Sequence, residues 1–333
     1  MVQCLEVNMN NIIKVSHSLL SPQSVRELLD GYHFETEIVS CEFLTRGLND
    51  SYVVTTQNEK YIFRVYRHNW RSKSDILFEM DALNWLKEKG LFVSAPVKTT
   101  QGNWTIDIQA PEGIRYGGLF TYSPGDRPEI NEENCGILGR SLAELHHKSS
   151  SLVSSHERSF ELDINHLLAE PVSTLLPLLD KHLQPDQVDT FNGITAKLEK
   201  MIRERKLEYG FCHGDFHNFN MHLKKQQLEV FDFDCCGFGY RAYDIAVFWW
   251  NLKNNYRTVE KACWNAFLNG YLSQRNMSEE DISSLPYFIS VRRIWLLGTM
   301  LKNEDVWGRN WINSTNFSQF LKDLAHDREL YKS

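Results

Sequence analysis

The 333-residue sequence has no run of 18 or more apolar residues, so it predicts no membrane-spanning helix. Its N-terminus lacks the positive charge and the apolar block of a signal peptide. The seven cysteines form no Cys-x-x-Cys pair, so neither a structural zinc site nor a disulfide framework is expected. The net charge of −7, with no basic tail, argues against sequence-independent nucleic-acid binding. We therefore expect a cytoplasmic protein with reduced thiols and with neither a nucleic-acid nor a membrane partner.

The length predicts about two domains of roughly 150 residues each. Residues 1–34 are expected to form a helical lead-in, in which Ser21 and Pro22 begin a helix that Gly31 ends. Residues 35–123 alternate β-branched and aromatic residues with polar ones, which predicts a small sheet of five strands. One helix is expected within this part, over residues 72–89, with Ser74 as its N-cap and Gly90 as its end.

The sequence Ser-Pro-Gly-Asp at 123–126 interrupts the strand pattern and predicts a domain boundary. Residues 124–333 are then mostly helical, with one β-hairpin over residues 220–233. The clearest helix patterns in this part cover residues 131–149, 167–179, 187–205 and 242–252.

The hairpin follows the most informative segment of the chain, His-Gly-Asp-Phe-His-Asn-Phe-Asn at 213–220. Asp215 and Asn220 are five residues apart on one tight loop, and the hairpin returns the chain so that Asp232 lies beside Asn220. Carboxylate and amide oxygens are ligand types that Mg²⁺ accepts together with nucleotide phosphates, which suits Asn220 and Asp232. Asp215 is then available to orient an attacking hydroxyl and to accept its proton.

The pattern His-Gly-Asp-x-His-x-x-Asn, followed by Asp-Phe-Asp-x-x-Gly-x-Gly and Tyr-Asp-Ile-Ala, resembles the aminoglycoside phosphotransferase and choline kinase superfamily. This superfamily includes type II homoserine kinases and bacterial stress-response Ser/Thr kinases. The resemblance extends from about residue 36 to about residue 325 and includes the segment 138–146. It implies an α+β, protein-kinase-like bilobal fold, with a small antiparallel-sheet N-lobe, a mainly helical C-lobe and ATP in the cleft between them.

The resemblance also implies roles for individual residues. Asp215 matches the catalytic aspartate, Asn220 and Asp232 match the Mg²⁺ ligands, and Asp244 matches a structural residue that anchors the loop. Arg64 stands where many relatives have a lysine for the nucleotide phosphates. The remaining nucleotide contacts that the resemblance implies are Glu79 as the partner of that cation, Gly47, Asn49 and Ser51 in the phosphate loop, and the backbone near Phe120 and Tyr122 for adenine.

Two features depart from the family pattern. Arginine at position 64 keeps the charge and can bind phosphate through two nitrogens, but it is bulkier than lysine. The phosphate loop has only one glycine, Gly47, so backbone amides with Asn49 or Ser51 have to hold the phosphate.

Several residues have alternative interpretations. A zinc site formed by His213, His217 and His222 is disfavoured because their spacing is not that of a metal site. Glu79 is either the phosphate-cation partner or a solvated helix charge, and Asp234 either supports the metal ligands or contacts the metal from outside. The aromatic loop 307–311 is a candidate wall of the acceptor pocket, while most other tryptophans are expected in the core.

The sequence thus predicts an ATP- and Mg²⁺-dependent kinase that transfers the γ-phosphoryl group to a hydroxyl of a small molecule, of homoserine, choline, amino-alcohol or aminoglycoside type. The carboxylates at 279–281 could contribute to a pocket for a polycationic aminoglycoside, or could simply begin a solvated helix. A Ser/Thr protein kinase is the first alternative. A weakly active nucleotide-binding scaffold is the second. The sequence assigns no oligomeric state.

Overall fold

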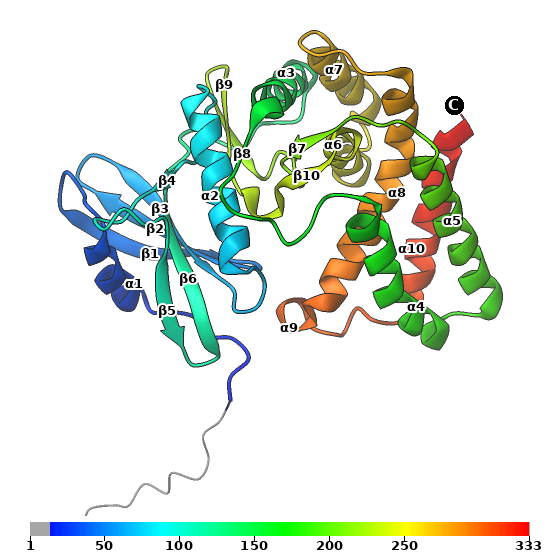
Figure 1. Cartoon of the computed structure of the whole chain (residues 1–333). Helices are drawn as coiled ribbons and strands as arrows, with labels where there is room; N and C mark the ends of the chain where they lie inside the picture. The colour runs from blue at the N-terminus through cyan, green and yellow to red at the C-terminus, as the bar shows by residue number, and fades with distance from the viewer. Residues whose placement is uncertain (1–13, 333) are drawn as a thin grey trace, which may run out of the picture. The chain divides into compact units, whose positions relative to one another are not determined.

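The computed structural model describes residues 14–332, so Cys4 and the first part of the predicted lead-in lie outside it. Antiparallel strands dominate the first part of the chain and helices the second, as the α+β prediction requires (Figure 1). The six cysteines of the described part form no disulfide with one another. By its internal contacts the chain divides into two compact units, which are described separately.

The smaller unit comprises the chain up to Lys73 together with Val97–Phe120. Its sheet has the strand order β1-β2-β3-β6-β4, and β5 pairs with β6. It has one strand more than predicted, because the two-residue β4 has too short a pattern to be recognised in the sequence. The strands are β1 (Ile38–Arg46), β2 (Asp50–Thr56), β3 (Lys60–Tyr66), β4 (Pro96–Val97), β5 (Ile106–Ala110) and β6 (Gly113–Thr121).

Helix α1 (Pro22–Leu28) packs along β1. As predicted, Ser21 is its N-cap, and the Ser21 side chain accepts a hydrogen bond from the Ser24 backbone N–H. Alternate residues of β2, including Tyr52 and Val54, are fully buried and form a core with side chains of α1, β3 and β6. This alternation is what the period of a strand produces when one face of a sheet is covered.

A buried ion pair fixes the start of β2. Asp50 accepts a hydrogen bond from Arg115 of β6 at 2.8 Å, and both side chains are fully buried. Arg115 also donates to the backbone oxygens of Val65 and Tyr66. Asp50, which lies within the predicted phosphate loop, is therefore held by contacts that involve β2, β3 and β6.

The larger unit comprises Ser74–Pro96 and Thr121–Ser333. Contacts thus group nearly all of α2 (Lys73–Glu88) with the helical part of the chain, whereas the sequence prediction placed it in a lobe of residues 35–123. That lobe boundary stays a prediction. Ser74 is not the N-cap: it lies inside the first turn, and its hydroxyl donates to the Glu157 carbonyl. Gly90 follows the helix with a φ of +78°, as expected of a terminating glycine.

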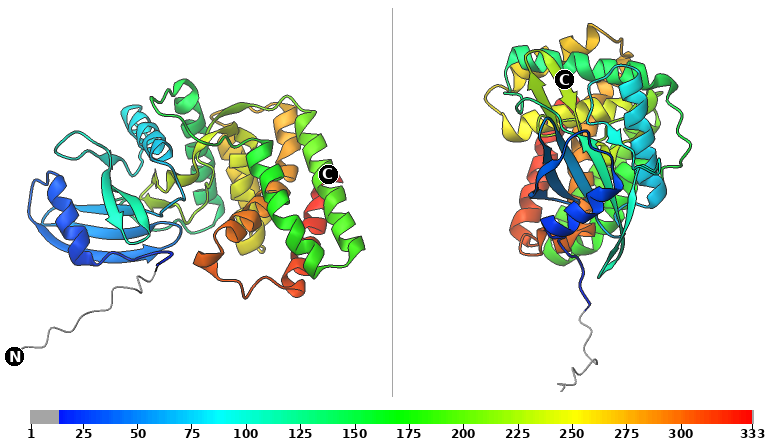
Figure 2. Two further views of the ribbon diagram at one scale, coloured as in Figure 1. Left: turned by 60° about the horizontal axis from the view of Figure 1, so that its bottom comes forward. Right: turned by 90° about the vertical axis from the view of Figure 1, so that its left-hand side faces the viewer.

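Two short antiparallel ribbons, β7 with β10 and β8 with β9, interrupt the helices of the larger unit. Helices α4, α5 and α10 pack against the long helix α8, and the left view of Figure 2 shows these helices side by side. The remaining elements are α3 (Glu132–Lys148), α4 (Glu170–His182), α5 (Pro185–Arg203), β7 (Tyr209–Cys212), β8 (Met221–Lys224), β9 (Gln227–Val230), β10 (Gly237–Tyr240), α6 (Arg241–Asn255), α7 (Glu260–Leu272), α8 (Glu279–Lys302), α9 (Glu304–Trp307) and α10 (Ser314–Asp327).

Helices α3 and α7 pack at unusually short range. A Cβ atom at Gly139 would lie 1.9 Å from the Phe267 carbonyl oxygen, so only glycine permits this approach. The packing holds α3 and its buried His146 against α7, which carries Tyr271. Among residues 14–332, no helix is both long and apolar enough to cross a membrane.

Candidate active site

The segment 213–220 connects β7, a strand that the sequence analysis did not predict, to the predicted β8–β9 hairpin. The ribbon of β7 with β10 was missed because its two four-residue strands are far apart in the sequence. Met221 pairs with Val230 in the hairpin, and the Phe231 N–H donates to the Asn220 carbonyl at 3.0 Å. The returning strand therefore places Asp232 one residue beyond the partner of Asn220. The sequence-predicted hairpin thus brings these two residues to the same end of the ribbon.

Asp244, on the first turn of α6, holds the backbone of the loop. Its carboxylate accepts hydrogen bonds from the backbone N–H groups of His213 and Gly214, at 2.7 and 2.8 Å. His146 lies 3.1 Å from the same carboxylate and 2.8 Å from the Tyr271 hydroxyl. All of these contacts are buried. Asp244 therefore anchors the loop, as the resemblance implied.

The charges of this anchor follow from its burial. Desolvation raises the pKa of Asp244, but hydrogen bonds and the interaction with His146 outweigh it and leave the pKa below the usual value. Burial lowers the pKa of His146, so this ring is neutral at pH 7. The neutral ring donates through Nε2 to Asp244 and accepts from Tyr271 at Nδ1. The carboxylate is thus fully engaged in hydrogen bonds that fix the loop.

Gly214 is required by the loop's shape. Its φ is +82°, and an added Cβ would lie 2.2 Å from the Cys235 carbonyl oxygen. No L-residue adopts this conformation without strain, and the close contact with backbone adds to the cost. The glycine of the motif therefore lets the loop pass directly over residues 233–235.

Three side chains surround the Asp215 carboxylate. The Asn220 amide nitrogen donates to Asp215 Oδ2 at 3.1 Å, and His217 Nε2 lies 3.3 Å from Oδ1. Arg292 of α8 forms a close ion pair with the same Oδ1. Asp215 remains partly exposed, with 23% of its side-chain surface accessible. The structure thus brings Asp215 and Asn220 together, as predicted, and adds two residues that the sequence analysis did not place beside Asp215.

This environment keeps Asp215 ionised. Desolvation raises its pKa, but the charge of Arg292, with a smaller contribution from His217, outweighs desolvation and holds the pKa far below the usual range. The carboxylate is therefore suited to position a hydroxyl group by accepting its hydrogen bond. This matches phosphoryl transfer, in which positioning and electrostatics provide most of the catalysis.

Arg292 is the functional candidate that sequence reasoning missed. Its side chain is 3% exposed, and its guanidinium lies 5.3 Å from the Trp250 ring centroid and 4.8 Å from that of Trp295. The signal was present in the sequence, since an arginine within the apolar segment of α8 must find a partner when the helix is buried. Two of the tryptophans predicted as core residues hold this arginine in place.

The residues that could hold a metal ion are Asn220 and Asp232. The Asn220 amide nitrogen is used by Asp215, which leaves the amide oxygen, a ligand type that Mg²⁺ accepts. Asp232 has left-handed backbone angles, with φ 63° and ψ 59°, which are uncommon for a residue other than glycine. Such conformations concentrate at functional sites. The donor set therefore fits a hard divalent cation.

In the smaller unit, the structure brings together part of the predicted nucleotide set. Ser51 of β2 is directly opposite Arg64 of β3, and the Arg64 guanidinium lies 5.2 Å from the Phe120 ring centroid. The Asn49 side chain accepts a hydrogen bond from the Arg67 N–H, so it braces its own loop. A Cβ atom at Gly47 would meet nothing within 4 Å, so sterics do not require glycine there. The phosphate-binding role of these residues stays a prediction.

Glu79 and Tyr122 belong to the larger unit. Glu79 is 1% exposed on α2, which excludes the alternative of a solvated helix charge. The Tyr122 ring lies 6.3 Å from that of His222. Their predicted contacts with the phosphate cation and with adenine stay predictions.

The three histidines considered for zinc have other hydrogen-bond partners. His213 Nε2 donates to the Phe231 carbonyl at 3.1 Å, and His222 Nδ1 donates to the Ser123 carbonyl at 2.7 Å. His217 accepts from the Phe219 N–H through Nδ1, which leaves its Nε2–H to face Asp215. Two of these histidines therefore brace the loop and the hairpin, and His217 contacts the carboxylate itself.

The carboxylates at the start of α8 are engaged in structure. Asp281 is buried and accepts a hydrogen bond from the Glu208 N–H at 2.9 Å, and Glu280 accepts one from the Lys206 N–H. Along α8, residues 279–281 lie about 18 Å from Arg292, at 1.5 Å per residue. They are therefore unsuited to recognise a cationic acceptor beside Asp215. In the loop 307–311, Trp307 is 38% exposed, and its role as an acceptor wall stays a prediction.

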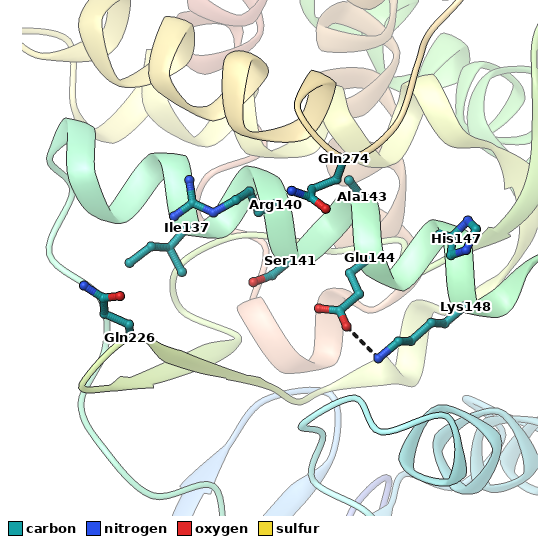
Figure 3. Close-up of a pocket in the computed structure, with 9 residues that line it drawn as sticks. All are labelled: Ile137, Arg140, Ser141, Ala143, Glu144, His147, Lys148, Gln226 and Gln274. Atoms are coloured by element: carbon teal, nitrogen blue, oxygen red, sulfur yellow. Dashed lines mark ion pairs between the residues drawn. The ribbon is translucent and has the colours of Figure 1, made fainter.

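A separate pocket of about 470 Å³ lies along α3, the β8–β9 turn and the end of α7 (Figure 3). Its polar side chains include Arg140, Gln226 and Gln274, and its carboxylate, Glu144, pairs with Lys148. None of the predicted site residues lines this pocket. The chemistry of the site is therefore built at the loop and hairpin.

Comparison with known proteins identifies the family of this chain. The profile of the phosphotransferase enzyme family matches residues 41–279, which is most of the chain. An uncharacterized protein of Deinococcus radiodurans is 32% identical over 94% of this chain and 92% of its own length. The amicoumacin kinase of Bacillus subtilis is 25% identical, covering 87% of each chain, and the homoserine kinase of Xanthobacter autotrophicus is 24% identical, covering 80% of this chain and 81% of its own.

Solved structures confirm the kinase-like fold. A structure of an amicoumacin kinase with AMP-PNP, Ca²⁺ and Ami has a TM-score of 0.75 at 20% identity, covering 92% of this chain and 93% of its own. A microcompartment-associated aminopropanol kinase has a TM-score of 0.74 at 22% identity, covering 92% and 94%. The match to the family over most of its length, together with the loop that presents Asp215 and Asn220, shows that this chain belongs to the phosphotransferase enzyme family and is a kinase that uses an alcohol group as acceptor.

Proposed function

We propose that the protein transfers the γ-phosphoryl group of ATP to a hydroxyl of a small molecule in a Mg²⁺-dependent reaction. The observation that carries the proposal is the Asp215 carboxylate, which is ionised, partly exposed and hydrogen-bonded to Asn220, the proposed metal ligand. This arrangement supports a hydroxyl-positioning group beside a divalent cation.

Each residue has a distinct role in this proposal. Asp215 accepts a hydrogen bond from the acceptor hydroxyl, and this bond aligns the hydroxyl oxygen with the phosphorus atom. The Asp215 carboxylate then receives the hydroxyl proton as the oxygen–phosphorus bond forms. Asn220 and Asp232 hold Mg²⁺, which when bound neutralises charge on the nucleotide phosphates. Arg64 contributes further phosphate contacts, together with the loop that contains Gly47, Asn49 and Ser51. In this proposal Glu79 orients the guanidinium of Arg64. The backbone near Phe120 and Tyr122 binds adenine.

A small-molecule acceptor is favoured over a protein by the substrates for which the relatives are named. These relatives are amicoumacin kinase, homoserine kinase and aminopropanol kinase. An aminoglycoside is disfavoured because Glu280 and Asp281 have structural partners. A catalytically weak scaffold is disfavoured because such a protein has no need of the Asp215, Asn220 and Asp232 set.

The test is ADP release from ATP and Mg²⁺ across a panel of hydroxyl compounds, with Asp215→Ala as the blank. The panel includes homoserine, choline, amino alcohols, sugars, aminoglycosides and a generic protein substrate. We expect stimulation by a small alcohol. Stimulation by the protein substrate alone would favour a protein kinase, and nucleotide binding without any stimulation would favour the scaffold.

A further inference from the structure

Two buried N–H groups, on Arg292 and on the tryptophan that it contacts, have no hydrogen-bond partner within the described part of the chain. They are Nε of Arg292 and the indole Nε1 of Trp250. The two side chains are in contact through the cation–π pair between α8 and α6. Buried donors that stay unpaired are costly, and such groups in a native structure call for a specific explanation.

Arg292 is fixed too firmly to satisfy its Nε by moving. Its guanidinium is in cation–π contact with the rings of both Trp250 and Trp295. Its Nη1 donates to the Tyr243 hydroxyl at 3.3 Å, and its Nη2 donates to Asp215. In a planar guanidinium, Nε–H lies on the same edge as one Nη2–H. An atom bound at Nε therefore lies next to the Asp215 carboxylate.

We propose that Arg292 Nε and Trp250 Nε1 form a recognition subsite of the acceptor, and that they donate hydrogen bonds to an oxygen atom close to the hydroxyl that is phosphorylated. The inference rests on the proposed function, because it assumes that the acceptor hydroxyl lies at Asp215. It adds a chemical requirement for the acceptor that the reaction itself does not impose.

The chemistry of the two donors defines the ligand class. A guanidinium and an indole N–H donate hydrogen bonds but accept none, so the bound group must offer lone pairs. A carboxylate or a hydroxyl oxygen meets this requirement, whereas an ammonium group has no lone pair and is repelled by the arginine. The subsite therefore selects alcohols that carry a second oxygen function, and a plain amino alcohol lacks the group that it binds.

Three compounds separate these possibilities. Homoserine carries a carboxylate, homoserinol has a hydroxymethyl group in its place, and the unbranched aminopropanol has neither. Binding of each compound is measured by calorimetry with ADP and Mg²⁺ present, and phosphoryl transfer is measured separately as ADP release from ATP. We expect homoserine or homoserinol to bind at least about tenfold more tightly than aminopropanol, the factor that one hydrogen bond supplies. The tighter of the two identifies the oxygen as carboxylate or hydroxyl.

The key variant is Trp250→Phe, which removes the N–H and keeps an aromatic ring against Arg292. It is expected to weaken binding of the oxygen-bearing compound about tenfold and to leave binding of aminopropanol and ADP unchanged. Trp249→Phe is the matched control, because this neighbouring indole donates to Glu260 at 2.6 Å. Arg292→Lys is the second variant: it keeps the charge, lacks the Nε edge and is expected to lose the same selectivity.

Equal binding of aminopropanol and the oxygen-bearing compounds would overturn the subsite, as would binding of none of them or an equal effect of Trp249→Phe. Phosphoryl transfer without this selectivity would leave the proposed function standing and the subsite refuted. Selective binding that Trp250→Phe abolishes, without phosphoryl transfer by the wild type, would support the subsite and contradict the proposed function.

Discussion

Arg292, which is buried, forms an ion pair with the partly exposed Asp215, a residue 77 positions earlier in the sequence. One partner lies on the tight loop after β7, and the other lies in the middle of α8. The pair connects the residue proposed to position the acceptor with α8, the helix against which α4, α5, α6 and α10 pack. It makes Asp215 a fixed, permanently charged group.

The proposed metal site predicts a specific loss in Asp232→Ala. This variant removes one of two ligands, so Mg²⁺ should no longer tighten nucleotide binding, and the affinity gained from Mg²⁺ should fall at least about tenfold. Calorimetric titration with ADP, with and without Mg²⁺, measures this gain. Asp107→Ala is the control, because that carboxylate forms an exposed pair with Lys73. An unchanged Mg²⁺ effect in Asp232→Ala would remove Asp232 from the metal site.

The backbone conformation of Gly214 predicts opposite outcomes for two glycine substitutions. Gly214→Ala should destabilise the protein by at least about 2 kcal/mol, because it combines a left-handed conformation with a backbone clash. Gly193 lies inside α5, where an added Cβ meets nothing within 4 Å, so Gly193→Ala should stabilise the protein by about 1 kcal/mol. Urea unfolding of both variants measures the difference. Equal stability of the two would contradict the described loop conformation.

The anchor of the loop predicts a large stability loss in Asp244→Asn. The variant replaces a buried carboxylate that accepts from two backbone N–H groups and His146, so we expect a loss of about 3 kcal/mol. Asp107→Asn, which disrupts an exposed ion pair, should cost less than about 1 kcal/mol. Chemical denaturation of the two variants compares these losses. A loss in Asp244→Asn no larger than that in Asp107→Asn would show that the anchor adds nothing to stability.

Buried His146 predicts that stability falls as the solution becomes acidic. The folded ring has a pKa below the usual 6.5, whereas the unfolded chain binds a proton near pH 6.5. The unfolded state therefore holds more protons between these values. The contribution of His146 to the free energy of unfolding is complete above pH 6.5. It decreases by about 1.4 kcal/mol per pH unit as the pH falls from 6.5 toward the pKa of the folded ring.

The matched variant is His146→Gln, which offers a donor and an acceptor but does not titrate. Its stability should change less steeply between pH 7 and the folded pKa than that of the wild type, by about 1.4 kcal/mol per pH unit. Urea unfolding at several pH values gives both slopes. Equal slopes would show that His146 does not titrate differently in the two states.

The sequence predicted the parts of the site that are close together in the chain. The loop 213–220 and the returning hairpin were identified because a turn and two short strands fix the positions of Asp215, Asn220 and Asp232 through local spacing. Arg292 was missed because its contact with Asp215 depends on how α8 packs against the loop, which no local pattern encodes. The two-residue β4 was missed for a related reason: its pairing is set by neighbouring strands.

The role proposed for Asp215, positioning the acceptor hydroxyl, is tested most directly by the turnover of Asp215→Ala together with its affinity for ADP and Mg²⁺. We expect kcat to fall by at least about 10²–10³, while the Kd for ADP changes by less than about threefold. Turnover above about a tenth of the wild-type value, with the fold intact, would contradict the role assigned to Asp215.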